Sequence, residues 1–153
     1  MPRAYLTCIS PLTGVKDTLA QSEIYGGEFV FRGRVESPSM CQIEIGNREI
    51  DLMVENTNME VTGTLMIPDQ IQVTGSSSND DWNRILRFER RYEAQRRKNW
   101  LKIVNTDVFD EIEKLESEYY QVFDSLYYML RSEVANNPTS FGCTYYVYYA
   151  YVN

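Results

Sequence analysis

The hydrophobic pattern of this chain changes its period once, and that change constrains the fold more than any other feature. Up to residue 75, apolar residues alternate with polar ones, as they do in strands that bury one face. After residue 76, apolar residues recur every three or four positions, as on one side of a helix. The stretch "GSSSNDDW" (residues 75–82) separates the two regions, and its serines and aspartates favour the start of a helix. The pattern predicts an α+β fold with a β-rich half, residues 1–75, followed by helices.

Seven segments of the first half have the alternation that is typical of strands. Gly33, Gly63 and Gly75 each follow a pair of alternating apolar residues, where a glycine permits a bulge or the end of a strand. Short antiparallel strands at this spacing predict a sandwich-like arrangement or an open barrel. The expected strands are Tyr5–Ile9, Leu19–Tyr25, Glu28–Val35, Gln42–Ile45, Ile50–Val54, Met59–Leu65 and Gln70–Val73.

Two helices of opposite charge are expected over residues 76–136. The first, roughly Asp81–Ile103, has eight basic and two acidic residues between positions 84 and 102. The second begins after residue 107, has six acidic residues within 107–118 and ends at residues 136–138. In an antiparallel hairpin these opposite charges would face each other, so we expect them to be matched. The second helix also has a heptad seam, which comprises Val108, Ile112, Leu115, Tyr119, Val122, Leu126 and Met129.

Further apolar residues widen this seam. They predict that the second helix packs against more than one neighbour. The residues concerned are Phe109, Tyr120, Phe123, Tyr127 and Leu130.

The residue inventory excludes most catalytic chemistry. Histidine is absent, which excludes Ser-His-Asp and Cys-His nucleophiles and the usual zinc sites. The three cysteines, Cys8, Cys41 and Cys143, form no C-x-x-C, so a thioredoxin-type pair and a zinc knuckle are excluded as well. The cysteines are either small buried side chains or, for Cys8 and Cys41, partners in a bridge between strands. We expect no catalytic residue, no metal and no cofactor in this chain.

Charge and patterning exclude two further classes. The chain has 15 Lys and Arg against 22 Asp and Glu, a net charge of −7, which argues against a nucleic-acid partner. No apolar run reaches the roughly 20 residues that a transmembrane helix needs. Glu49, Asp51 and Glu55 lie near one expected strand, and the first two, on one face, could act as the acid and base of a glycosidase. A solvent-facing side of the strand accounts for them more simply, and we favour that interpretation.

The most aromatic stretch lies in the last segment, residues 137–153. As a helix, it would bury a stripe formed by Phe141, Tyr145 and Tyr148 and leave Tyr146 more exposed. As a strand, the odd-numbered residues from 145 to 151 would share one face. We favour the helix, as a core or junction element. The alternative is a ligand-binding surface, for which the candidate residues are Tyr146, Tyr149 and Tyr151.

Read in order, four motifs resemble one protein family. They are "GGEFVFRGRVESP" (26–38), "MVENTNMEVTG" (53–63), "VTGSSSNDDW" (73–82) and "NPTSF" (137–141). Together they are similar to the DUF4369 family, the N-terminal domain that precedes thioredoxin-like and peroxiredoxin-like modules in bacterial cell-envelope thiol-disulfide proteins. We interpret the matching residues as structural markers: Asp17, Gly27, Phe29, Phe31, Gly33, Pro38, Val54, Glu55, Asn56, Val61, Gly63, Val73, Gly75, Ser76, Asn79, Asp80, Trp82, Asn137, Pro138, Ser140 and Phe141.

The resemblance implies a function. The chain, a single domain over 1–153, would be the non-catalytic N-terminal module of a cell-envelope thiol-disulfide oxidoreductase, and would position or dimerise the redox domain or present its partner. The implied partners are a thioredoxin-like domain of the same polypeptide, another protein, or a second copy. The family usually opens with a further strand after a lipoprotein signal, and a thioredoxin-like domain usually follows; neither is in this chain.

The resemblance also implies a location, the periplasm, with a lipid anchor in the full-length form, although residues 1–11 lack a signal-peptide pattern. The alternative function is an independent binding domain that holds a peptide or glycan at a sheet edge or at the tyrosine-rich surface. A carboxylate enzyme is the interpretation that we favour least.

Overall fold

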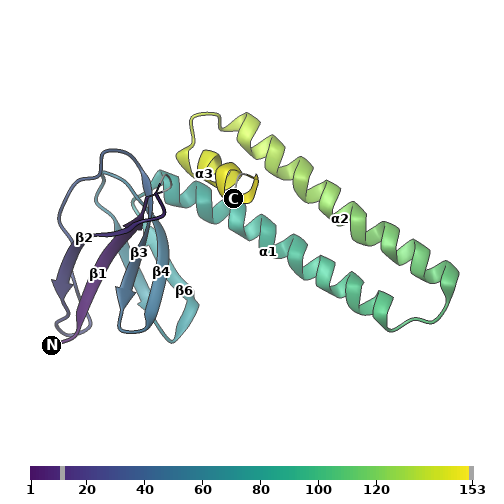
Figure 1. Cartoon of the computed structure of the whole chain (residues 1–153), viewed down its shortest axis with the longest axis horizontal. Coiled ribbons are helices and arrows are strands. Elements are labelled where there is room, and N and C mark those ends of the chain that lie inside the picture. The colour runs from purple at the N-terminus through teal and green to yellow at the C-terminus, as the bar shows by residue number, and fades with distance from the viewer. Residues whose placement is uncertain (11–12, 152–153) are drawn as a thin grey trace. The chain divides into compact units, whose positions relative to one another are not determined.

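The computed structural model describes residues 1–10 and 13–151, and the side chains of these residues other than 68, 69 and 151. The chain divides into two compact units, Met1–Asp80 and Asp81–Asn153. Within the described residues the first unit is built from strands and the second from helices, which confirms the predicted α+β class (Figure 1). The boundary lies close to residue 75, where the hydrophobic period changes.

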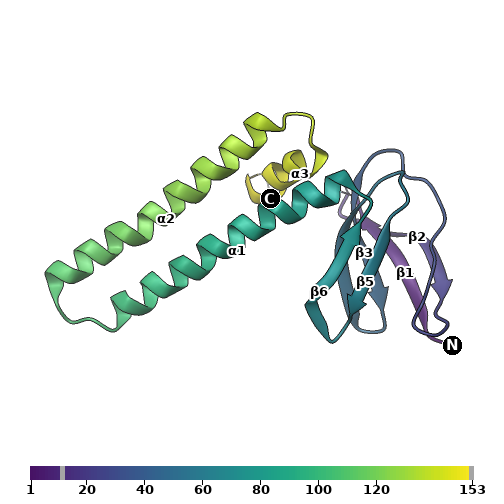
Figure 2. The ribbon, with the colours of Figure 1, turned by 180° about the vertical axis from the view of Figure 1, so that it is seen from behind.

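Antiparallel strands form two sheets in the first unit (Figures 1 and 2). One sheet has four strands in the order β2-β1-β3-β4, and the other pairs β5 with β6. Six of the seven predicted strands are present, with boundaries shifted by a few residues. The observed strands are β1 (Arg3–Ile9), β2 (Lys16–Glu23), β3 (Ser39–Ile45), β4 (Arg48–Val54), β5 (Glu60–Thr64) and β6 (Ile67–Thr74).

The core of the first unit lies between the two sheets. Leu6, Ile43 and Leu52 of the four-stranded sheet are buried, and Val61 and Val73 of the β5–β6 sheet pack against them. Alternate residues of each strand face this core, as the period-2 pattern predicts. The predicted sandwich-like arrangement is confirmed.

The predicted strand Glu28–Val35 is wrong. Phe29 and Phe31 do pack on the core, which explains the alternation, and their ring centroids lie 5.3 Å apart. The backbone of this segment is not part of either sheet, however. At its end the side chain of Asn56 takes the place of a neighbouring strand: the Val35 N–H donates to Asn56 Oδ1 at 2.9 Å, and Asn56 Nδ2 donates to the Val35 carbonyl at 2.7 Å. Apolar alternation therefore reports the burial of side chains here and not sheet pairing.

Two of the three glycines act as the sequence predicts. Gly63 lies at the register shift of β5 with φ 146°, and a Cβ there would approach the Ile71 Cα to 2.8 Å. Gly75 ends β6 with φ 84°, and a Cβ there would lie 2.1 Å from the Asn58 carbonyl oxygen. Gly33 is different, because a Cβ at this position would have no atom within 4 Å. A strand bulge explains Gly63 and a strand exit explains Gly75, but the expectation for Gly33 was wrong.

The second unit contains three helices: α1 (Ser77–Val104), α2 (Phe109–Asn136) and α3 (Phe141–Tyr151). Helices α1 and α2 run antiparallel as a hairpin, and α3 lies beside them at the end where α1 begins and α2 ends (Figures 1 and 2). The two predicted helices of the hairpin are confirmed, and α1 begins earlier than expected. The preference for a helix in the last segment is confirmed too.

Candidate functional site

The cysteines of the first unit form a disulfide. Cys8 of β1 and Cys41 of β3 lie directly opposite each other in the sheet, and the bond closes a loop with a sequence separation of 33. The remaining cysteine, Cys143, is a free thiol and is fully buried. Of the two alternatives for Cys8 and Cys41, the structure has the bridge. No described pair of thiols is available for dithiol exchange.

The carboxylates of β4 lie on the exposed side of the sheet. Glu49 is 3.4 Å from Lys16 Nζ, and Lys16 also pairs with Glu44 of β3. Asp51 accepts a hydrogen bond of 2.9 Å from Gln42. Each carboxylate therefore has a partner on the same surface, and both are exposed to solvent. The interpretation of Glu49 and Asp51 as a solvated strand face agrees with this geometry.

One polar cluster crosses this surface. Hydrogen bonds from Lys16 and from Thr7 hold the pKa of Glu44 below its usual value, and the Thr7 hydroxyl lies 2.8 Å from Glu44 Oε1. The same hydrogen bond to Glu44 raises the pKa of Lys16. A carboxylate that stays charged and an ammonium that stays charged form a fixed ion pair. Neither is suited to exchange protons near neutral pH.

The third carboxylate, Glu55, caps the start of α1. Burial alone would raise the pKa of Glu55, but hydrogen bonds from serine hydroxyls and backbone N–H groups at the helix start outweigh it, and the pKa is lowered. The Ser78 hydroxyl donates to Glu55 Oε2 at 3.0 Å, and the Ser78 N–H donates to Oε1 at 3.3 Å. The Ser76 hydroxyl accepts from the Asn79 N–H at 3.0 Å. This carboxylate therefore has a structural role at the positive end of the helix.

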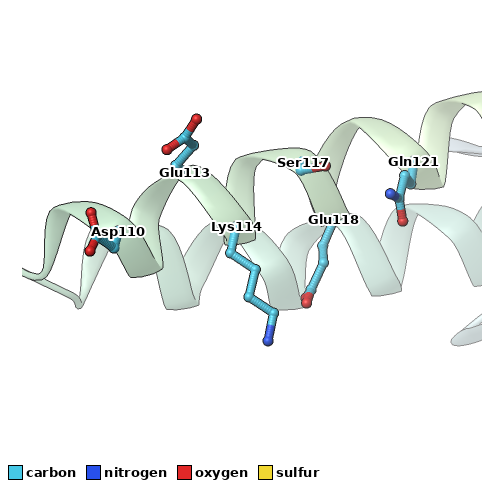
Figure 3. Close-up of a pocket in the computed structure, with 6 residues that line it drawn as sticks. All are labelled: Asp110, Glu113, Lys114, Ser117, Glu118 and Gln121. Carbon is cyan, nitrogen blue, oxygen red and sulfur yellow. The ribbon is translucent and has the colours of Figure 1, made fainter.

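The acidic side of α2 surrounds a shallow hollow (Figure 3). All of its lining residues come from this one helix, so it has no opposite wall. In Figure 3 the carboxylate of Glu113 points away from the side on which Lys114 and Glu118 lie. Divergent carboxylates cannot converge on one cation, and none of the described His, Cys, Asp and Glu residues form a group that could hold a metal. The lining residues are Asp110, Glu113, Lys114, Ser117, Glu118 and Gln121.

The predicted matching of charges between the two helices is wrong in its location. Across the described part of the chain, no ion pair joins the basic stretch 84–102 to the acidic stretch 107–118. The pairing occurs at the other end of the hairpin, where Arg84 contacts both Asp81 and Glu133. In the middle, the Arg96 guanidinium lies 4.4 Å from the ring centroid of Phe123. Large aromatic side chains separate the helices there, so facing carboxylates and guanidinium groups do not meet.

The aromatic helix α3 packs around Trp82. The Trp82 ring lies 5.6 Å from the Tyr145 ring and 6.0 Å from the Tyr146 ring. Tyr146 is only 4% exposed, and its hydroxyl donates to Glu89 at 3.1 Å. The expectation that Tyr146 is the exposed residue was therefore wrong. The apolar and aromatic residues of α3 lie on all sides of the helix, so their spacing did not identify the side that faces α1.

Of the three tyrosines of the candidate binding surface, the structure describes the side chains of two, and these differ in exposure. Tyr146 is buried, which excludes it from contact with a ligand in this structure. Tyr149 is 60% exposed, with its ring edge-on to Trp82 at 6.4 Å. The side chain of Tyr151 lies outside the described residues. A stacking platform built on these three residues is not supported.

Comparison with known proteins identifies a family from the first unit. The sequence profile of a domain of unknown function, DUF4369, matches residues 5–82. The chain belongs to this family. No curated protein and no solved structure matches the chain. Among the described helices of this DUF4369 protein, none is long and apolar enough to cross a membrane.

The DUF4369 match covers residues whose roles in the structure are architectural. Asn56 satisfies the backbone of Val35, and the buried Asn79 accepts the Met53 N–H at 3.1 Å. Gly75 permits a contact between backbones that any side chain would block. These residues make the sandwich and the start of α1, and we find no chemistry among them. The hairpin α1–α2 lies almost entirely outside the DUF4369 match.

The most prominent unexplained surface lies on this hairpin. Several large apolar side chains are exposed between the middle of the hairpin and the turn that joins α1 and α2, and we single out five of them, with exposed fractions from 39% for Phe123 to 78% for Phe109. Exposed apolar clusters of this kind mark interaction sites. The sequence had indicated this surface, because several of its residues widen the heptad seam of α2 and predict a second packing partner for that helix. We call this surface the aromatic face: Trp100, Val104, Phe109, Tyr120 and Phe123.

Proposed function

We propose that this protein is a non-catalytic interaction module that positions or dimerises a thioredoxin-like domain in the cell envelope, or presents the partner of that domain. The observation that carries the proposal is the aromatic face, a large exposed apolar surface on a hairpin without any cluster of reactive groups among its described residues. A surface of this kind serves binding and not bond making.

The disulfide supports a place in the cell envelope. A bond between Cys8 and Cys41 persists in oxidising compartments, whereas cytosolic thiols are kept reduced. The bond joins neighbouring strands inside the sandwich, and Cys41 is 1% exposed. Reductants therefore have poor access to it, as expected for a structural bridge and not for a catalytic one.

Family membership supports the link to a redox domain. The motifs that resemble DUF4369 include both asparagines that satisfy backbone groups and the glycine that ends β6. In the proteins that the resemblance points to, this module precedes a thioredoxin-like domain that carries the reactive cysteines. The present module would then supply geometry and contacts, and the other domain would supply the chemistry.

An insulin-reduction assay tests the non-catalytic role. The purified chain should not accelerate the reduction of insulin by dithiothreitol, because its only free thiol, Cys143, is buried. A thiol titration on the protein isolated from the periplasm should find no reactive thiol in the native state and one after unfolding. A reduction rate above the reagent background that disappears in Cys41→Ser would refute the proposal.

A second candidate function is supported by the segment that replaces the seventh strand. Within the described residues, no hydrogen bond joins the backbone of 29–34 to another backbone group, and the Val30 N–H donates to the Ser22 hydroxyl at 3.2 Å. Arg32 and Arg34 are exposed and lie on the same side of the extended chain. An extended peptide with carboxylates could add here as a strand. Fluorescence anisotropy with a labelled Glu-rich peptide, compared between the wild type and Arg32→Glu, tests this candidate.

A further inference from the structure

The aromatic face occupies one side of the hairpin. On α1, Arg96 faces α2, because its guanidinium lies over the Tyr119 and Phe123 rings, and Trp100 and Val104 lie on the flank next to it, which is set by 3.6 residues per turn. On α2, Tyr119 faces α1, where it contacts Trp100 and Arg96, and the flank next to it includes Phe123. Because the helices are antiparallel, these two flanks lie on the same side of the hairpin. Ring contacts across the hairpin agree: the Trp100 ring is 6.2 Å from the Tyr119 ring, and the Tyr119 ring is 5.5 Å from the rings of Tyr120 and Phe123.

Helix α3 contacts the other half of the same flank. Trp82 and Glu89 precede Trp100 on this flank of α1, and both contact α3 through Tyr146. Helix α3 lies at the end of the hairpin opposite the turn (Figures 1 and 2). The chain thus contacts half of this flank with an aromatic helix of its own and leaves the half near the turn exposed.

We propose that the aromatic face binds the same face of a second copy of this chain, which forms a two-fold dimer of hairpins. This inference rests on the proposed function and deepens it, since it specifies dimerisation as the way in which the module positions its partner domain. In such a dimer the exposed side chains of both copies would form the core of a four-helix arrangement.

The charges beside the aromatic face select both the partner and its orientation. On the side of α1 the flank carries Arg97, and on the side of α2 it carries Glu116; both are exposed and lie at similar distances from the turn. If the two-fold axis runs parallel to the helices, α1 of one copy lies against α2 of the other, and basic residues meet acidic ones. If the axis runs across the helices, α1 lies against α1 and α2 lies against α2, so the acidic flank of α2, which carries Glu116, meets a flank of like charge. The first arrangement is favoured because juxtaposed like charges oppose association.

A hollow along α1 fits this arrangement. It lies on the same flank as Arg97, with which Glu93 and Leu101 also line it. In the favoured orientation α2 of the second copy lies over this hollow, and an aromatic side chain such as Tyr120 can enter it, as knobs enter holes between packed helices. The complete lining is Glu89, Arg90, Glu93, Ala94, Arg97, Lys98 and Leu101.

Sedimentation velocity on the full chain, from about 1 to about 100 µM, tests the dimer. We expect the wild type to associate with concentration and Tyr120→Glu to weaken the dimer by about tenfold or more, because the variant places a charge in an apolar contact. Tyr128→Glu is the matched control: Tyr128 is 72% exposed on α2 but lies away from the aromatic face, so this variant should associate like the wild type. A wild type that stays monomeric over this range overturns the inference.

An exchange of charges tests the orientation. Arg97→Glu and Glu116→Arg should each weaken self-association by about tenfold, because each creates two like-charged contacts per dimer. An equimolar mixture of the two variants should associate again, since both contacts in the mixed dimer then join opposite charges. Arg91→Glu and Asp124→Arg reverse charges on the other sides of α1 and α2 and should change little. A mixture that fails to associate, with each variant folded by circular dichroism, overturns the proposed orientation.

These outcomes separate the inference from the proposed function. A monomeric chain that is inactive on insulin would remove the dimer and leave a non-catalytic module that positions its partner in another way. A chain that dimerises and also reduces insulin would retain the inference and remove the proposed function.

Discussion

Removal of the Cys8–Cys41 bond should weaken the first unit selectively. The bond closes a loop with a sequence separation of 33, and loop-closure entropy for that length corresponds to about 3.7 kcal/mol at 25 °C. In Cys8→Ala/Cys41→Ala, strands β1 and β3 keep their hydrogen-bonded register, and the unfolded chain gains freedom. We therefore expect the free energy of unfolding of the sandwich to fall by about 3 to 4 kcal/mol.

Hydrogen exchange measured by mass spectrometry resolves this effect by segment. Amides of β1, β3 and β4 should exchange faster by a factor that corresponds to the lost free energy, since core strands exchange through global opening of their unit. Amides of the middle of α2 should be unchanged. Trp82 and Trp100 both belong to the second unit, so tryptophan fluorescence reports the hairpin and serves as an internal reference.

Cys143→Ala provides the matched control. It also removes a buried cysteine, but Cys143 is a free thiol in the second unit, so the sandwich strands should keep their protection. A loss below about 1 kcal/mol in the double variant would refute the reasoning from loop closure. An equal loss of protection across both units would show that the units unfold together, and the selective effect would be refuted.

Three further changes have defined outcomes. Gly75→Ala should lower the free energy of unfolding of the sandwich by about 3 kcal/mol or more, because residue 75 has a positive φ and its new Cβ would lie 2.1 Å from a carbonyl oxygen. Gly33→Ala should cost little, and urea denaturation followed by circular dichroism compares the two variants. Tyr146→Ala should cost the helical unit about 3 to 4 kcal/mol and Tyr149→Ala less than about 1 kcal/mol, as measured by tryptophan fluorescence during denaturation; equal losses would contradict the burial of Tyr146. The lowered pKa of Glu55 adds stability that is complete above 4.5, the pKa of this group in the unfolded chain, and that is lost as the pH falls through the pKa in the folded chain. Glu55→Gln should therefore flatten the acid side of the profile of unfolding free energy against pH. An unchanged slope would contradict the capping role.

The sequence predicted the helices and strands that bury one side against a single core, because that burial sets the spacing of their apolar residues. Strands β1, β3 and β4 each bury one face on the same core, so their alternation located them. Helix α2 was found from its seam and ended where Asn136 and the following proline predict. The segment 28–35 was misassigned because Phe29 and Phe31 alternate as in a strand. Its backbone partner, the amide of Asn56, lies 21 residues away from Val35, and no local pattern shows it.

The candidate site was predicted less well, because its residues depend on contacts between helices. The opposite charges of α1 and α2 suggested matched pairs, but ion pairs need close approach, and Arg96 lies against aromatic rings in the middle of the hairpin. The pairing instead joins Arg84 to Glu133 at the other end of the hairpin, and these two residues are 49 positions apart in the sequence. The disulfide stayed an open alternative since it requires the strand register, which places Cys8 opposite Cys41.

The tyrosines account both for the wrong prediction that Tyr146 is exposed and for the proposed dimer through the aromatic face. Of the 12 tyrosines in the chain, several lie in α3, where Tyr146 is buried against Trp82 although neighbours of similar character surround it. Burial there depends on a partner helix that belongs to the same chain. The equivalent flank of the hairpin near the turn has the same kind of side chains, such as Tyr120, and among the described residues no helix lies over it. An aromatic helix covers one half of this flank. To be buried in the same way, the half near the turn needs a partner surface that is apolar and carries complementary charges at its edges. A second copy of the hairpin supplies both properties, with Arg97 opposite Glu116 at its edges.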